Sequence, residues 1–231
     1  MDISVEKTPK QVLSHYVVDT ASMISITHLP TSTLTKVSTA CIELNEQAGS
    51  AKAVAHIGAR NIQSKNELHT NCIAMRKAGV DKVLIIGGTT YEGKVYQTAH
   101  EIREEIADYG FTMYCGTYPQ NLLHNTHLDR FAGGITQMCL NTRLLNNWIN
   151  NTKNTRIGVP SNCSVKGLYK YMKICGLTES IAHALGNISG LKYLNSNGFN
   201  TTKFVNDLSP IPIHVYNFGK LDQTIMQLEF K

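Results

Sequence analysis

Residues 54–68 combine the end of an apolar run, two side chains able to take part in chemistry, and a helix start. His56 and Arg60 follow the run at 51–57, and Ser64 and Glu67 then have the spacing of a capping box. Ligands bind at the carboxyl ends of strands in α/β proteins, so an imidazole and a guanidinium there are placed for chemistry. The alternative, a neutral core histidine beside a surface arginine, stays open.

Other polar residues also follow expected strand ends. The set is rich in amides and hydroxyls and has few charges, and it consists of Glu6, Thr27, His28, His56, Arg60, Gly87, Gly88, Thr89, Thr90, Thr117, Tyr118, Pro119, Gln120, Gln137, Pro160, Ser161, Asn162, Tyr216 and Asn217. Glutamine and asparagine carry a donor and an acceptor on one planar group. Such a lining therefore suits a flat heteroaromatic ligand.

Eight strand-like runs must position these side chains. The clearest is 82–86, a continuous apolar run between Asp81 and Gly87, as in a strand covered on both faces. The others are expected at 3–6, 22–27, 51–57, 111–117, 134–140, 156–160 and 212–216. Helices are predicted at 31–47, 64–78, 98–109 and 221–228, with a further helix start at Thr8 and with Gly79 ending the second.

This alternation predicts an α/β fold, a single (β/α)8 TIM barrel over residues 1–231. A doubly wound open sheet is the main alternative, because alternation alone does not force closure. The asparagine-rich stretch 141–154 is expected to be a solvated helix and loop. The connection 161–208 is long enough for two or three helices and constrains the barrel least.

Composition narrows the class of protein. The formal charge of +5 is modest and its basic residues are scattered, which argues against a nucleic-acid partner. Six cysteines without a C-x-x-C pair, mostly inside apolar segments, indicate reduced thiols. No apolar run approaches the roughly 20 residues that cross a bilayer, and the N-terminus has no signal-like apolar core, so a cytoplasmic protein without membrane contact is expected.

A metal site is not predicted. His124 and His127 have a suitable spacing, but no carboxylate pair lies nearby, and two solvent-facing histidines explain them better. The sequence leaves the oligomeric state open, with a homo-oligomer among the alternatives.

Several of these motifs resemble those of methylenetetrahydrofolate reductases. Residues 56–60 and 64–68 are similar to that family's His-Leu-Thr-Cys-Arg run and the following helix, which begins Thr/Ser-x-x-Glu-Leu. Residues 3–8 resemble the opening strand with the glutamate that protonates folate N5, and residues 134–137 resemble Ala-Ile-Thr-Gln, whose glutamine contacts the pterin. The resemblance implies Glu6 as the catalytic acid and Gln137, Tyr118 and Asn217 as substrate contacts.

The chain departs from the family at the flavin site. Where the family has Leu-Arg-Gly-Asp after strand four, this chain has Ile-Gly-Gly-Thr at 86–89, so both charged groups are missing. The segment that holds the flavin diphosphate and ribityl is also shortened, to 120–132. The resemblance then implies flavin contacts from His56, Gly87, Gly88, Thr89, Tyr118 and Arg130, with His124 and Asn125 as other replacements for the lost contacts.

Two mechanisms follow from this resemblance. In the first, FAD reduced by NAD(P)H passes hydride to 5,10-methylenetetrahydrofolate and gives 5-methyltetrahydrofolate. In the second, the tetrahydrofolate pocket is kept without flavin, in a folate-binding protein or a methyl-transfer component. A barrel with an unrelated substrate is the third alternative, because one fold hosts many chemistries.

Overall fold

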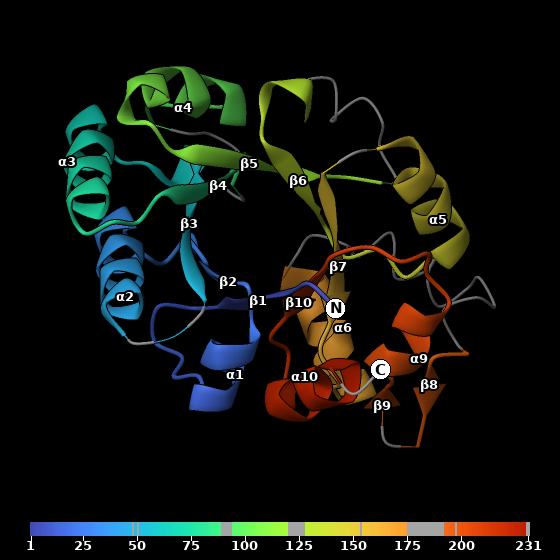
Figure 1. Cartoon of the computed structure of the whole chain (residues 1–231). Helices are drawn as coiled ribbons and strands as arrows, with labels where there is room; N and C mark the ends of the chain where they lie inside the picture. Colours follow the sequence, from blue (N-terminus) through green and yellow to red (C-terminus); the bar gives the residue numbers. More distant parts are fainter. Residues whose placement is uncertain are drawn as a thin grey trace.

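Eight parallel strands close into a barrel with helices outside it (Figure 1). The computed structural model describes residues 1–47, 49, 51–88, 94–119, 128–152, 154–174, 192–196 and 198–229. The barrel strands are β1 (Ile3–Lys7), β2 (Met23–Ile26), β3 (Lys52–Gly58), β4 (Lys82–Ile86), β5 (Thr112–Thr117), β6 (Gly133–Thr136), β7 (Thr155–Pro160) and β10 (Ile213–Tyr216). β1 pairs with both β2 and β10, so the sheet has no free edge. The predicted (β/α)8 fold is confirmed, and an open sheet is excluded.

Strand side chains alternate between the two faces of the barrel wall. On β4, Val83 and Ile85 belong to the large core under the helices, whereas Leu84 belongs to a smaller cluster inside the barrel. That inner cluster is apolar and combines Met23, Val54, Leu84 and Ile135. The neighbouring strands β1 and β10 instead turn polar residues inward, with Ser4 paired to His214 in register.

The outer layer contains α1 (His15–Thr20), α2 (Leu34–Glu46), α3 (Lys65–Lys77), α4 (Ala99–Glu105), α5 (Thr142–Asn151), α6 (Val165–Ile174), α9 (Thr201–Asn206) and α10 (Leu221–Glu229). The predicted cap at Ser64 is confirmed, because its hydroxyl accepts the Glu67 N–H at 3.1 Å. The Glu67 carboxylate reaches the N–H groups of Gln63 and Leu34, so it also ties α3 to the start of α2. Gly79, at φ +78°, ends α3 as predicted.

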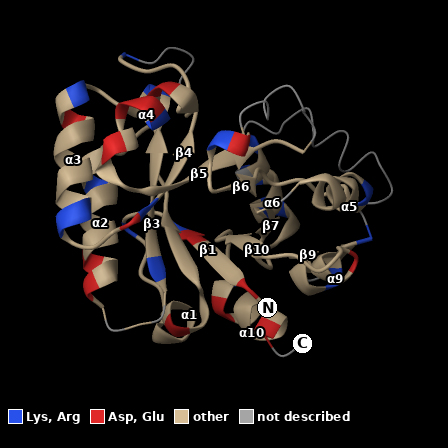
Figure 2. Cartoon of the chain, turned by 45° about the horizontal axis from the view of Figure 1, so that its top comes forward, with Lys and Arg blue, Asp and Glu red and all other residues tan. Residues whose placement is uncertain are grey.

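Charged residues of both signs are spread over the outer helices (Figure 2). Four of the five described cysteines are buried and Cys139 is half-buried, all of them as free thiols; Cys175 lies outside the described residues. In the described part of the chain, no helix has both the length and the apolar character needed to cross a bilayer.

Two element predictions, the helix start at Thr8 and the strand at 134–140, differ from the structure. Residues 8–11 form one hydrogen-bonded turn, closed by Gln11 N–H to the Thr8 carbonyl, and the helix begins only at His15. The predicted strand 134–140 ends at Thr136. There the Gly158 N–H donates to the Thr136 hydroxyl and the Tyr216 hydroxyl donates to the Thr136 carbonyl, so side chains replace the ladder bonds.

The remaining differences lie on the C-terminal half and near α4. The predicted helix 98–109 divides into α4 and a 3-10 turn, η2 (Ala107–Tyr109). α5 buries Leu145 and Trp148, so the asparagine-rich stretch is amphipathic rather than fully solvated. Between α6 and α9, a small antiparallel pair was not predicted, β8 (Leu194–Asn195) with β9 (Gly198–Phe199).

Candidate functional site

A cavity of about 320 Å³ opens at the carboxyl ends of the barrel strands. Its lining comes from seven of the eight barrel strands and the loops after them: Glu6, Lys7, Thr8, Gln11, Thr27, His28, Leu29, Pro30, His56, Asn61, Leu84, Ile86, Gly88, Gly116, Thr117, Tyr118, Ile135, Gln137, Tyr216, Asn217 and Phe218. The predicted convergence of His56, Gln137 and other strand-end groups around one hollow is confirmed. A cavity of this size is at the lower end of the range for small-molecule sites.

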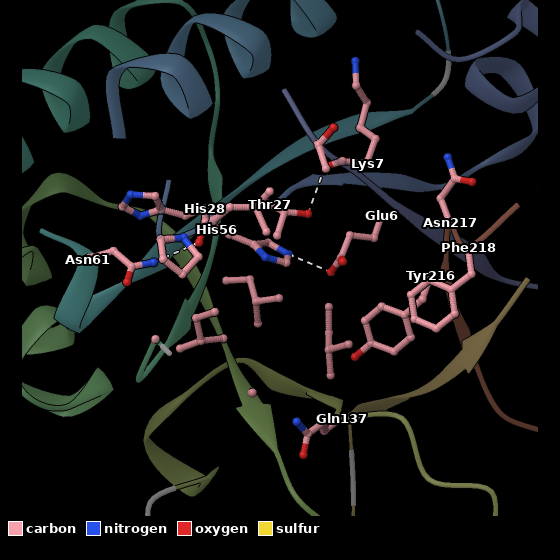
Figure 3. Close-up of a pocket in the computed structure, with 18 of the residues that line it drawn as sticks. Glu6, Lys7, Thr27, His28, His56, Asn61, Gln137, Tyr216, Asn217 and Phe218 are labelled. Atoms are coloured by element: carbon pink, nitrogen blue, oxygen red, sulfur yellow. Dashed lines mark hydrogen bonds and ion pairs between the residues drawn. The ribbon is translucent and has the colours of Figure 1, made fainter. Parts of the chain in front are cut away.

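Glu6 is the carboxylate of this cavity, and the imidazole of His56 faces it (Figure 3). The imidazole of His214 also faces it. Its Oε2 atom lies 3.6 Å from Nε2 of His56 on β3 and 3.7 Å from Nε2 of His214 on β10. The Glu6 side chain is 19% exposed, whereas those of His56 and His214 are 4% and 0% exposed. Both distances are longer than a hydrogen bond. Little water screens charges in this largely dry site, so electrostatic attraction between the Glu6 carboxylate and the imidazoles is still strong at this range.

Burial and the contacts with the two imidazoles shift the pKa of the Glu6 carboxyl group in opposite directions. Burial raises the pKa of Glu6, but the polar contact with His214 and the attraction of both imidazoles outweigh it, so the pKa lies below its ordinary value. Burial lowers the pKa of His56 to about 4, although Glu6 acts against this shift. At neutral pH, Glu6 is therefore ionised and His56 is neutral.

One side of the cavity is an aromatic and apolar wall. The rings of Tyr216 and Phe218 are stacked, with centroids 5.7 Å apart and planes 17° apart (Figure 3). Leu84, Ile86 and Ile135 extend the apolar lining deeper into the barrel. Gln137 approaches from the side opposite Lys7 and Glu6 in the same view. A planar ligand would therefore meet apolar surface on its faces and polar groups at its edge.

Two further lining residues have a buried polar atom without a hydrogen-bond partner; Thr117 was expected at a strand end, whereas Asn61 was not singled out from the sequence. The Asn61 amide nitrogen donates to the His28 carbonyl at 3.0 Å, which leaves its Oδ1 atom buried without a hydrogen-bond partner. The hydroxyl of Thr117, 1% exposed, also has no partner. Buried polar atoms are normally satisfied, so these two atoms are candidates for ligand contacts. The only available signal for Asn61 was its position in the loop after His56.

The structure brings together most of the predicted site residues. Glu6, His56, Gly88, Tyr118, Gln137 and Asn217 all line the cavity. Gly87 and Arg130 are not among its lining residues: the Gly87 carbonyl accepts from Arg60, and the Arg130 guanidinium contacts His100. Arg60 also donates to the Gly88 carbonyl, so this predicted strand-end cation fastens the loop after β4. Thr89, Gln120, His124, Asn125 and His127 lie outside the described residues.

Metal binding finds no support in the described ranges, where no group of three or more His, Cys, Asp or Glu residues could hold an ion. The described lining offers Glu6, which can exchange a proton, and amides that can hydrogen-bond to a ring edge.

The comparisons with known proteins concern the fold. No family model matches the sequence, and no curated protein matches it. Among solved structures, an oxaloacetate acetylhydrolase is similar with a TM-score of 0.50 and 9% identity, covering 99% of this chain and 79% of that one. A 2,3-dimethylmalate lyase of the PEP mutase/isocitrate lyase superfamily gives 0.48 and 9%, covering 99% and 80%. A dihydrodipicolinate synthase gives 0.44 and 11%, covering 99% and 96%.

None of these three structures is described as a methylenetetrahydrofolate reductase. At 9% identity, the likeness to the oxaloacetate acetylhydrolase supports the barrel fold alone and assigns no family. The chain is therefore identified as a (β/α)8 barrel protein with a cavity at the carboxyl ends of its strands.

Proposed function

We propose that this barrel binds a tetrahydrofolate-type ring and acts in folate-dependent one-carbon chemistry, with Glu6 exchanging a proton with ring nitrogen N5. The observation that carries the proposal is the joint presence of Glu6, Gln137 and the stacked pair Tyr216 and Phe218 on one cavity. A reduced pterin is flat, and its edge carries alternating donors and acceptors. The amide of Gln137 can pair with such an edge while the aromatic pair covers a face.

The chemistry asked of Glu6 is general acid–base catalysis. Its position beside the cavity and its partial exposure allow its carboxyl group to reach a bound ring. Proton transfer by a positioned carboxyl group typically contributes about 10²–10⁴ in rate. Neutral His56 also lines the cavity, and its buried Nδ1 atom has no hydrogen-bond partner in the structure.

The reductase version of this proposal requires FAD as the hydride carrier, with NAD(P)H as reductant. Of the residues that line the cavity, only Lys7 is a lysine or arginine. Burial lowers the pKa of the Lys7 ammonium group, and Cys41 and Glu43 of α2, outside the barrel, act against this shift. A diphosphate needs cationic or N–H partners, and the described lining does not fit one. We therefore favour the flavin-independent alternative and derive no step through flavin.

A titration tests the folate proposal, and a visible spectrum distinguishes its two versions. Tetrahydrofolate added to the purified full chain is expected to raise its unfolding temperature, because a ligand that binds only the folded state stabilises it by mass action. p-Aminobenzoylglutamate, which lacks the pterin ring, is the matched control and should have no such effect. The visible spectrum of the same sample tests the reductase version, which predicts bound flavin. Absence of stabilisation by tetrahydrofolate would refute the folate proposal in both forms.

A further inference from the structure

A buried chain of polar groups continues below Glu6 into the barrel. The His214 ring lies between Glu6 and Ser4, with Nε2 facing Glu6 at 3.7 Å and Nδ1 2.9 Å from the Ser4 hydroxyl. Ser4 and His214 are both 0% exposed. The proposed ring-binding role uses neither of them, and a fully buried imidazole at the base of a ligand cavity requires an explanation.

The Ser4 hydroxyl determines which nitrogen of His214 carries a hydrogen. Ser4 Oγ donates to the Ile213 carbonyl at 3.3 Å, a bond that occupies its single hydrogen. In that arrangement the same oxygen accepts from His214 at 2.9 Å, which requires a hydrogen on Nδ1 in both the neutral and the charged ring. Nε2 is consequently the nitrogen whose hydrogen can come and go, and it faces the carboxylate.

Few other groups compete for that proton. His56 approaches the same Oε2 atom from β3, but its pKa of about 4 keeps it neutral at pH 7. His28 affects the group formed by Glu6, His56 and His214 only by an electrostatic effect that lowers the pKa of His56. The ring of Tyr216 packs edge-on against His214, with centroids 5.2 Å apart and planes 87° apart. The hydroxyl of Tyr216 donates to the Thr136 carbonyl and so points away from the pair.

An ionised resting Glu6 needs a source of the proton that it gives to a ligand. We propose that His214, fixed by Ser4, is a positioning residue that holds the Glu6 carboxylate and supplies this proton from Nε2. The proton leaves the Nε2–H of the charged ring and joins Oε2, giving neutral His214 and a carboxylic acid. After ligand release, a proton from bulk solvent reaches Oε2 of Glu6 through the open mouth of the cavity and passes back to Nε2 of His214. This role rests on the proposed function of Glu6 as the group that exchanges a proton with the ligand.

The transfer needs a shorter approach than the resting 3.7 Å. Glu6 is 19% exposed and borders the cavity, so a rotation of its side chain can close the gap. Catalytic hydrogen bonds are commonly long in a ligand-free site and tighten once the ligand is bound.

Two spectroscopic measurements on the ligand-free full chain test this role. With ¹⁵N-labelled histidine, His214 is expected to show a hydrogen on Nδ1 throughout, and Ser4→Ala should release this restriction and populate the Nε2–H tautomer. With ¹³C-labelled glutamate, the signal absent from Glu6→Gln identifies the Glu6 carboxyl. Its titration midpoint should rise by about one pH unit or more in His214→Gln, which removes the contact that favours the carboxylate.

His69→Gln is the matched control, because its imidazole faces Glu105 in the outer helical layer at 2.8 Å. That variant should leave the Glu6 midpoint unchanged. A neutral His214 ring with its hydrogen on Nε2 and none on Nδ1 in the unmodified chain, or a Glu6 midpoint unaffected by His214→Gln, would overturn the inference. Neither measurement uses folate. If tetrahydrofolate does not bind, only the tetrahydrofolate titration shows it, so the two proposals are tested separately.

Discussion

Nε2 of His56 lies 3.6 Å from Oε2 of Glu6, although β2 separates the strands that carry them. Both side chains point inward, and the small inward side chain between them, Ser25, leaves room for the contact. The pair places a neutral imidazole against an ionised carboxylate at the base of the cavity. Its protonation therefore links the stability of the barrel to pH.

Acid should destabilise the barrel through His56. Its pKa of about 4 in the folded chain lies below the ordinary 6.5, so between these pH values the unfolded chain binds the extra proton. The stabilisation is complete above pH 6.5 and is lost as the pH falls toward 4, by roughly 2–3 kcal/mol. Urea unfolding at a series of pH values measures it. His56→Gln should make the free energy of unfolding depend less on pH, whereas His15→Gln, on the surface of α1, should leave this dependence unchanged. Equal pH dependence in both variants would contradict the assignment of the effect to His56.

Replacing Glu6 by glutamine should separate binding from chemistry. The amide keeps the size of the side chain but cannot exchange a proton, so folate-dependent turnover should fall by about 10²-fold or more. Tetrahydrofolate affinity should change little. Glu43→Gln, an exposed change on α2, is the control. Normal turnover of Glu6→Gln at saturating substrate would remove Glu6 from the mechanism.

Truncation of Gln137 should weaken ligand binding. Loss of an amide that pairs with a ring edge costs about 1–2 kcal/mol, or roughly 5–30-fold in Kd. Isothermal titration of Gln137→Ala with tetrahydrofolate measures the change, and Gln47→Ala at the exposed end of α2 serves as the control. An unchanged Kd for Gln137→Ala would show that this residue does not contact the ligand.

An alanine at Gly158 should disturb the barrel wall. A Cβ atom there would lie 2.2 Å from the Thr136 carbonyl oxygen and 2.6 Å from a ring carbon of Tyr216. Backbone cannot yield as a flexible side chain does, so a loss of about 1–3 kcal/mol in the free energy of unfolding is expected. Gly167→Ala, whose Cβ would have its nearest contact with the Ser164 hydroxyl at 3.2 Å and its next at 3.7 Å, should change stability by less than about 1 kcal/mol. Equal stability of the two variants would show that β6 and β7 can separate at low cost.

The sequence alone determined the local elements and their order. Apolar runs of strand length, the cap at Ser64 and the left-handed glycine at 79 depend on neighbouring residues only, and the predicted elements there are confirmed. The errors occur where contacts distant in the sequence compete with local preference. β6 stops early because Tyr216 and Gly158, from other strands, take the hydrogen-bonding groups of Thr136.

Only the tertiary structure decided closure and the composition of the site. Period-two alternation shows that two faces exist, but it cannot say which face is enclosed until β10 pairs with β1. That pairing turns His214 toward Glu6 and places Ser4 beside it, contacts that no short-range pattern contains. The orientation of Asn61 likewise depends on the His28 carbonyl from another strand end. Site geometry therefore came from closure of the barrel, because closure fixes which distant strands are neighbours.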